Sequence, residues 1–213
     1  MLQSKDLPVL PLWINGRAFL TLASGFVDVQ HSVSAIALRR TPLCGVAEVA
    51  LAVEAAQGAL SLWQRAAVAE RIALLEKLAD QLSAYASHFS RLICEEGTQD
   101  EAKAAAEVAS SILELRSARA ENAGSLIAAP SVTAVIGCRQ APLLGVLKCA
   151  VPALLSGAPL VLCPAPEVPS ALLALAELST RCGFPPGVIN ILYGDDDTVK
   201  TLREALGEDL FFA

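Results

Sequence analysis

The sequence is poor in aromatic and basic residues, and these shortages argue against several functions. Phe, Trp and Tyr make up 5% of the 213 residues while Ala and Leu dominate, which favours helices packed on a sheet over an all-β sandwich. With 22 acidic and 16 basic residues the net charge is −6, so the chain cannot neutralise a run of phosphates. We therefore expect no nucleic-acid partner and no polybasic membrane contact.

Histidine and patterned cysteine, the usual ligands of zinc, are also scarce. The two histidines, His31 and His88, lie far apart, and the six cysteines show no CxxC spacing. We expect no metal site and interpret the thiols as reduced, mostly buried groups. The first residues lack the continuous apolar stretch of a signal peptide, so the sequence predicts a cytoplasmic protein.

One long apolar run, residues 142–163, is the stretch that a membrane span would need. Lys148 lies inside it, and Pro152, Gly157 and Pro159 interrupt it. A buried helix followed by a buried strand fits these interruptions better than a single span does. The sequence therefore predicts no membrane-embedded segment here.

The first half of the chain predicts a hairpin followed by helices. Asn15-Gly16 between two apolar stretches is typical of a two-residue β-hairpin turn, and the second arm is predicted to continue to about Val29. Apolar residues at three- and four-residue spacing then predict helices, with Arg71 and the charges of the last helix on the solvent side. The predicted helices cover residues 46–60, 66–86, 87–96 and 100–122.

The second half alternates short apolar runs with amphipathic stretches. Strands are predicted at residues 132–136, 160–162, 188–192 and 209–212, with helices at 143–155, 170–181 and 198–206. Ser170 is predicted to be the N-cap of its helix. Strand–helix alternation at this spacing implies a parallel sheet with right-handed crossovers.

Several strings in this order resemble the aldehyde dehydrogenase superfamily: WING at 13–16, VAEVALAVEAAQGALSLW at 46–63, ERIALLEKLADQL at 70–82, PALLSGAPLVLCPAPEVPSALLALAEL at 152–178 and GFPPGVINILYGDDD at 183–197. The resemblance implies one α/β unit over residues 1–213. Within it we expect an extended hairpin region at 1–45, a helical layer at 46–124 and a partial Rossmann-like parallel sheet at 130–213.

The resemblance also implies a chemistry: a cysteine thiolate attacks an aldehyde, hydride passes to NAD(P), and the thioester is hydrolysed. The family's nucleophilic cysteine and general-base glutamate come later in its chain than residue 213, so we expect no catalytic residue within this sequence. The family's oxyanion-stabilising asparagine lies in a Pro-Trp-Asn turn, which corresponds here to Cys138, Arg139 and Gln140. Gln140 retains an amide donor on a longer side chain.

The cofactor region implied by the resemblance is altered too. The family's Lys-Pro-x-Glu string, which binds the adenosine ribose, corresponds to Cys163, Pro164, Ala165 and Pro166, so both polar side chains are replaced. Gly187 and Gly194 remain, either as cofactor-region residues or as turn glycines. The cofactor-binding candidates are therefore Gln140, Cys163, Pro164, Gly187 and Gly194, in a region that we expect to hold no cofactor; NAD(P) is the alternative by family resemblance.

These observations lead to three hypotheses of different classes. The first is a catalytically inactive, non-catalytic binding or regulatory subunit. It would meet a protein partner, or a second copy of itself, through an exposed edge of the sheet near Phe212. The second is part of an NAD(P)-dependent aldehyde dehydrogenase whose catalytic half is not in this sequence. The third is a small NAD-binding regulatory module.

Overall fold

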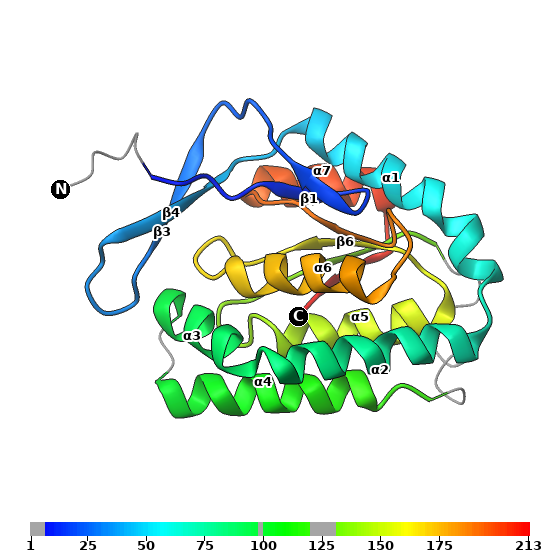
Figure 1. Cartoon of the computed structure of the whole chain (residues 1–213). Coiled ribbons are helices and arrows are strands. Elements are labelled where there is room, and N and C mark those ends of the chain that lie inside the picture. Colours follow the sequence, from blue (N-terminus) through cyan, green and yellow to red (C-terminus); the bar gives the residue numbers. More distant parts are fainter. Residues whose placement is uncertain (1–6, 98–99, 120–130) are drawn as a thin grey trace.

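A six-stranded sheet lies at the centre of the computed structural model, which describes residues 7–97, 100–119 and 131–213 (Figure 1). The strand order is β2-β1-β7-β6-β5-β8. The parallel strands are β5 (Thr133–Ile136), β6 (Leu160–Cys163), β7 (Ile189–Ile191) and β8 (Leu210–Phe212). Each coincides with an apolar run of the sequence. β5, β6 and β7 are almost entirely buried, as expected for strands that are covered on both faces. The predicted α/β fold with a parallel sheet is confirmed.

The N-terminal hairpin is part of this sheet. β1 (Leu12–Ile14) and β2 (Arg17–Phe19) flank Asn15 and Gly16, whose φ angles of 53° and 73° confirm the predicted turn. β1 then pairs antiparallel with β7, a contact that the sequence pattern did not predict. The buried Asn190 secures the junction: its Oδ1 accepts from the backbone N–H of Asn15 at 3.0 Å, and its Nδ2 donates to the carbonyls of Leu160 in β6 and of Gly187 just before β7.

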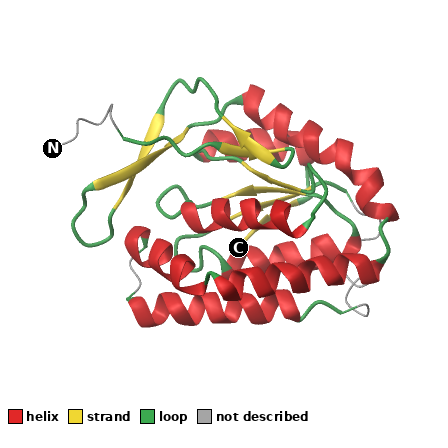
Figure 2. Cartoon of the chain, in the orientation of Figure 1, coloured by secondary structure: helices red, strands yellow, loops and turns green. Residues whose placement is uncertain are grey.

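Helices cover both faces of the sheet (Figure 2). α1 (Val46–Arg65) and α7 (Asp196–Leu206) contact each other on one face, and α5 (Leu144–Ser156) and α6 (Ser170–Cys182) lie on the other. A further layer packs on α5 and α6; it consists of α2 (Val68–Ala84), α3 (Ala86–Glu96) and α4 (Glu101–Arg116). α4 ends before the predicted residue 122, because 117–119 are no longer helical; 120–122 lie outside the described residues.

The apolar run at 142–163 is divided as predicted, into α5 and β6. Gly157 ends α5 in the left-handed conformation, with φ of 98°, and so turns the chain into the strand. By length and composition α1 is also long and apolar enough to cross a membrane. In the fold, 33% of its most apolar 18-residue stretch is buried. Its buried face packs on β7 and α7, which accounts for its composition.

The charges on α2 do not all face solvent. Arg71 was predicted outside, but it is buried, and its Nη1 donates to the carbonyl of Trp63 at 3.1 Å. A guanidinium suits the carboxyl end of α1 because the last carbonyls of a helix lack partners and carry partial negative charge. Trp63 is itself fully buried, donates to the Leu154 carbonyl at 3.1 Å, and packs against the ring of Phe184.

A second, smaller sheet lies to the side of the first (Figure 1). It consists of β3 (Phe26–Gln30) and β4 (Ala37–Pro42), which pair antiparallel; we call this pair the ribbon. The prediction that the hairpin's second arm continues to Val29 is wrong, because β2 ends at Phe19 and β3 pairs with a different strand. β4 was not predicted at all: it contains two adjacent arginines and a terminal proline, which carry no alternating apolar pattern.

Candidate functional site

The carboxyl ends of β5, β6 and β7 meet at one edge of the sheet, where ligands commonly bind in parallel α/β folds. Gln140 lies exposed in the loop after β5, Cys163 is the last residue of β6, and Pro164 follows it. Gly194 comes shortly after β7, just before α7 begins. The structure therefore brings four of the five cofactor-region candidates to one edge.

Gly187 lies at the opposite end of the sheet, before β7 begins. Its φ is 85°, and a Cβ there would overlap the carbonyl oxygen of Ala55 in α1. A left-handed backbone and a close helix approach both require glycine. This placement separates Gly187 from the other four candidates and favours the turn-glycine interpretation.

Gly194 also has an internal reason to be glycine. A Cβ at this position would overlap the side chain of Thr198 in the first turn of α7. The Thr198 hydroxyl donates to the Cys44 carbonyl at 2.6 Å, which ties α7 to the segment that leads into α1. The glycine thus lets α7 approach the loop closely.

Cys163 lies where the family resemblance implies a ribose-binding lysine, and its thiol stays neutral. The residue is buried, and burial raises the pKa of its thiol to about 12. Burial likewise raises the pKa of the nearby Cys44 to about 11. Because the thiolate is the nucleophile and the metal ligand, neither sulfur is suited to covalent or metal chemistry at neutral pH. In the described part of the chain no cluster of His, Cys, Asp and Glu could hold a metal ion.

Carboxylates occupy the amino ends of all three helices that follow β5, β6 and β7. Glu107 of α4 accepts from the backbone N–H of Leu143 at 2.9 Å and Leu144 at 3.3 Å, at the start of α5. At α7, Asp195 accepts from the backbone N–H groups of Asp197 and Thr198. A helix amino end binds phosphate through such free N–H groups and its positive partial charge. In this chain, internal carboxylates already accept from these N–H groups and offset the positive partial charge.

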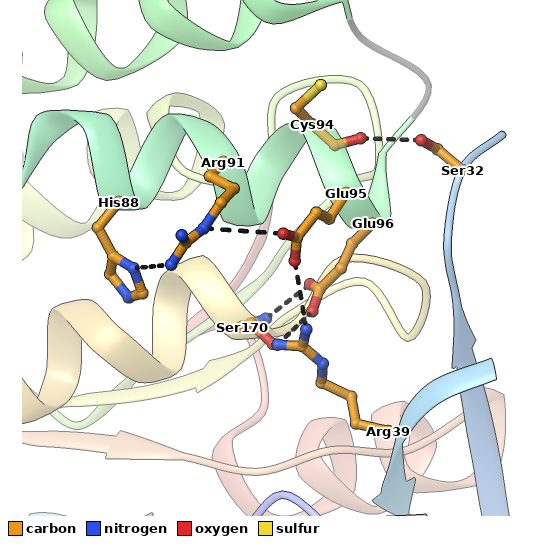
Figure 3. Close-up of polar contacts among 8 residues, drawn as sticks. All are labelled: Ser32, Arg39, His88, Arg91, Cys94, Glu95, Glu96 and Ser170. Atoms are coloured by element: carbon orange, nitrogen blue, oxygen red, sulfur yellow. Dashed lines mark hydrogen bonds and ion pairs between the residues drawn. The ribbon is translucent and has the colours of Figure 1, made fainter. Parts of the chain in front are cut away.

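The amino end of α6 is held by Glu96, the last residue of α3 (Figure 3). Its Oε2 accepts from the backbone N–H of Ser170 at 3.0 Å. The predicted N-cap role of Ser170 is therefore wrong: the Ser170 hydroxyl makes no cap bond and accepts instead from Arg39 Nη1 at 2.9 Å. Sequence reasoning missed Glu96 and Glu107 because a carboxylate that caps a distant helix looks like any other helix charge.

Arg39 of β4 completes this cluster. Its Nη1 lies 3.1 Å from Glu96 Oε1, and its Nη2 lies 3.6 Å from Glu95 Oε2 (Figure 3). Glu95 is also 3.7 Å from Arg91 Nε. Glu96 is almost completely buried, and burial raises the pKa of its carboxyl group, although Ser170 and Arg39 act in the opposite direction.

A cavity of about 150 Å³ lies beside Glu96, between the ribbon and the carboxyl edge. The loops after β5 and β6 contribute Arg139 and Glu167 to its wall, α3 contributes Glu96, and the ribbon and its turn contribute the remaining lining. The family resemblance implies a tryptophan at the position of Arg139. The structure places the charged Arg139 side chain on the wall of this polar cavity.

Comparison with known proteins identifies the fold. The sequence profile of the "Aldehyde dehydrogenase family" matches residues 23–207. Human mitochondrial succinate-semialdehyde dehydrogenase is 30% identical over 213 aligned residues, which cover 92% of this chain and 39% of the relative. The N-succinylglutamate 5-semialdehyde dehydrogenase of Ectopseudomonas mendocina is 36% identical over 188, which cover 78% and 37%.

A solved structure agrees with these relatives. Lactaldehyde dehydrogenase from Escherichia coli superposes with a TM-score of 0.83 at 26% identity, covering 92% of this chain and 45% of that one. The chain thus spans less than half the length of each of these proteins. Because the family profile matches most of its residues and the folds agree, this chain belongs to the aldehyde dehydrogenase family.

Proposed function

We propose that this chain acts by binding, as a non-catalytic member of the aldehyde dehydrogenase family, and does not oxidise aldehydes by itself. One observation carries the proposal: the turn after β6 lacks both polar side chains that the family resemblance implies for binding the adenosine ribose. The turn after β6 presents a neutral, buried Cys163 and Pro166 where the family resemblance implies lysine and glutamate.

Electrostatics at the same edge support this proposal. NAD(P) carries a negatively charged pyrophosphate, which binds best where backbone N–H groups are free and positive charge is near. Glu96, Glu107 and Asp195 occupy those N–H groups at α6, α5 and α7. Asp196 and Asp197 add further negative charge in the first turn of α7. A phosphate at these helix ends would have to displace a carboxylate and approach its neighbours.

Isothermal titration calorimetry with NAD⁺ and with NADP⁺ tests the proposal directly. We expect no saturable heat up to millimolar dinucleotide. A further relative, the NADP⁺-dependent succinate-semialdehyde dehydrogenase of Escherichia coli, serves as the binding control for NADP⁺. The double variant Cys163→Lys, Pro166→Glu restores the family's polar pair and should gain affinity if it stays folded by circular dichroism. A micromolar dissociation constant for the unaltered chain would refute the proposal and support the NAD-binding module instead.

A second candidate, part of an NAD(P)-dependent aldehyde dehydrogenase, is supported by the coverage of the relatives. The aligned region is 39% of the human enzyme and 45% of the Escherichia coli lactaldehyde dehydrogenase. The test is to supply a polypeptide with the remaining half of the fold and to follow NAD(P)H absorbance with succinate semialdehyde. Turnover that requires both polypeptides would favour this candidate over a non-catalytic role.

We further propose that a protein partner, or a second copy of this chain, pairs with the β8 edge. Among the described strands β8 is the last in the sheet order, and Phe211 and Phe212 are 44% and 60% exposed. Such a strand presents unpaired backbone groups and apolar side chains to solvent. Light scattering after size exclusion should show that the unaltered chain associates. Phe212→Lys should abolish this association, whereas Leu113→Lys, at an exposed position of α4, should not. A monomer that captures no partner would contradict this proposal.

The cytoplasmic location stays a prediction.

A further inference from the structure

The ribbon is attached to the protein differently from every other strand. Its two strands pair with each other, and only residues 8–10 form a further backbone contact with β4. None of residues 26–42 belongs to the continuous hydrophobic core that joins the large sheet to the helices. A two-stranded ribbon without an apolar face on a core is only marginally stable alone. Val29 and Thr41 are nonetheless buried, so the polar contacts of the ribbon add to a small amount of packing in holding its position.

Two sets of polar contacts hold the ribbon against the ends of α3 and α6. At its turn, the Ser32 backbone N–H donates to the Glu95 carbonyl at 2.7 Å, and the Ser32 hydroxyl donates to the Cys94 carbonyl at 2.8 Å. In β4, the Arg39 guanidinium reaches Glu96, Glu95 and the Ser170 hydroxyl (Figure 3). Arg39 is thus the side chain that joins the ribbon to two helices at once.

The ribbon also covers part of the carboxyl edge. The cavity of about 150 Å³ that contains Arg139 and Glu167 has its opposite wall in β3 and the ribbon turn, including Gln30 and His31. A second cavity, of about 760 Å³, is lined by the same turn, α3 and the start of α4. The ribbon turn therefore borders a cavity on each side of its attachment to α3.

We propose that the ribbon is a strap, pinned by Arg39, that opens as a unit and widens the cavity lined by Arg139 and Glu167 while the six-stranded sheet stays folded. Opening breaks the polar contacts of Ser32 and Arg39, and no ribbon residue belongs to the main hydrophobic core. Segments with few apolar contacts are the ones that open locally at low free energy. This proposal does not depend on whether the chain binds a dinucleotide.

The neighbouring arginine provides a matched control. Arg40 pairs with Asp28 at 2.8 Å and lies over the ring of Phe26, so its side-chain contacts stay within the ribbon. Arg39→Gln removes the pin, whereas Arg40→Gln weakens the ribbon without touching its attachment to α3 and α6. Arg39→Lys keeps the charge but cannot bridge several oxygens with a planar fork.

Amide hydrogen exchange on the full chain, read by mass spectrometry for peptides of the ribbon and of the sheet, tests the strap. In Arg39→Gln we expect ribbon peptides that include Ser32 to exchange about tenfold faster or more, from the loss of charge-assisted bonds. Peptides of β5, β6 and β7 should be unchanged, and Arg39→Lys should be intermediate. In Arg40→Gln the ribbon turn should keep its protection at Ser32.

Two outcomes would overturn the proposal. Unchanged ribbon exchange in both Arg39 variants would mean that the guanidinium does not pin the ribbon. Equal acceleration in the ribbon and in the sheet peptides would mean that opening is global and that no separate strap exists. Should Arg39→Gln fail to fold, the comparison of Arg39→Lys with the unaltered chain decides between the same outcomes.

Discussion

Glu96 tests whether a buried carboxylate stabilises this fold through its charge or through its shape. Its Oε2 accepts from the Ser170 N–H, and Oε1 faces Arg39. Glu96→Ala leaves a buried backbone donor without an acceptor, which costs about 1–3 kcal/mol. Glu96→Gln keeps an oxygen for Ser170 and avoids the desolvation of a charge. We therefore expect Glu96→Ala to lower the free energy of unfolding by about 1–3 kcal/mol at pH 7.5, and Glu96→Gln to leave it unchanged or raise it.

The pH dependence follows from the direction of the pKa shift. Burial raises the folded-state pKa of Glu96 above its ordinary value of 4.5, so the folded state holds this proton more tightly than the unfolded chain does. The resulting stability is fully present below about pH 4.5 and is lost as pH rises through the folded-state pKa. Relative to Glu96→Gln, which cannot titrate, the unaltered chain should therefore gain stability as pH falls from 7.5 toward 5.

Urea unfolding followed by tryptophan fluorescence, at several pH values, measures this difference directly. Using the difference between the two proteins cancels the titration of all other groups. The reasoning would be refuted if Glu96→Gln were as unstable as Glu96→Ala and if the advantage of the unaltered chain grew as pH rose. That result would mean that the ion pair with Arg39 outweighs burial.

Four further predictions concern packing, glycine geometry and thiol chemistry. Trp63→Ala removes a fully buried ring and should lower the free energy of unfolding in urea by about 3–5 kcal/mol. Gly58→Ala, in the interior of α1 with open space around the new methyl, should raise it by about 0.5–1 kcal/mol. Gly194→Ala should lower it by about 1–3 kcal/mol because the methyl overlaps Thr198; equal effects of the two glycine changes would contradict the geometry. Cys163 should resist a thiol reagent at pH 8 until urea unfolds the chain, and rapid labelling of native protein at this residue, located by mass spectrometry, would contradict its burial and its pKa of about 12.

Local patterns were enough to predict most elements of this fold. The runs that became β5, β6 and β7 are short and mostly apolar, as expected for strands that are buried on both faces. The hairpin followed from Asn15-Gly16, since a tight turn there needs two positive φ angles. In such places the preference of a few neighbouring residues coincides with the environment that the fold supplies.

The candidate site was predicted less completely. The family resemblance located Gln140, Cys163 and Gly194, and the structure places all three at the carboxyl edge. It placed Gly187 in the same region, but proximity along the chain is no guide to which end of a strand a residue occupies. The role of Glu96 also had no local signal, because the N–H that it accepts from, at Ser170, is 74 residues away.

The sequence alone determined the class of fold and the order of the helices and strands from α1 to β8, because both depend on local pattern. Only the tertiary structure decided which charges are buried, that β1 joins β7, and that Arg39 ties the ribbon to α3 and α6. Those features depend on which distant segments meet, and a charge has the same local signature whether it faces water or closes the end of another helix.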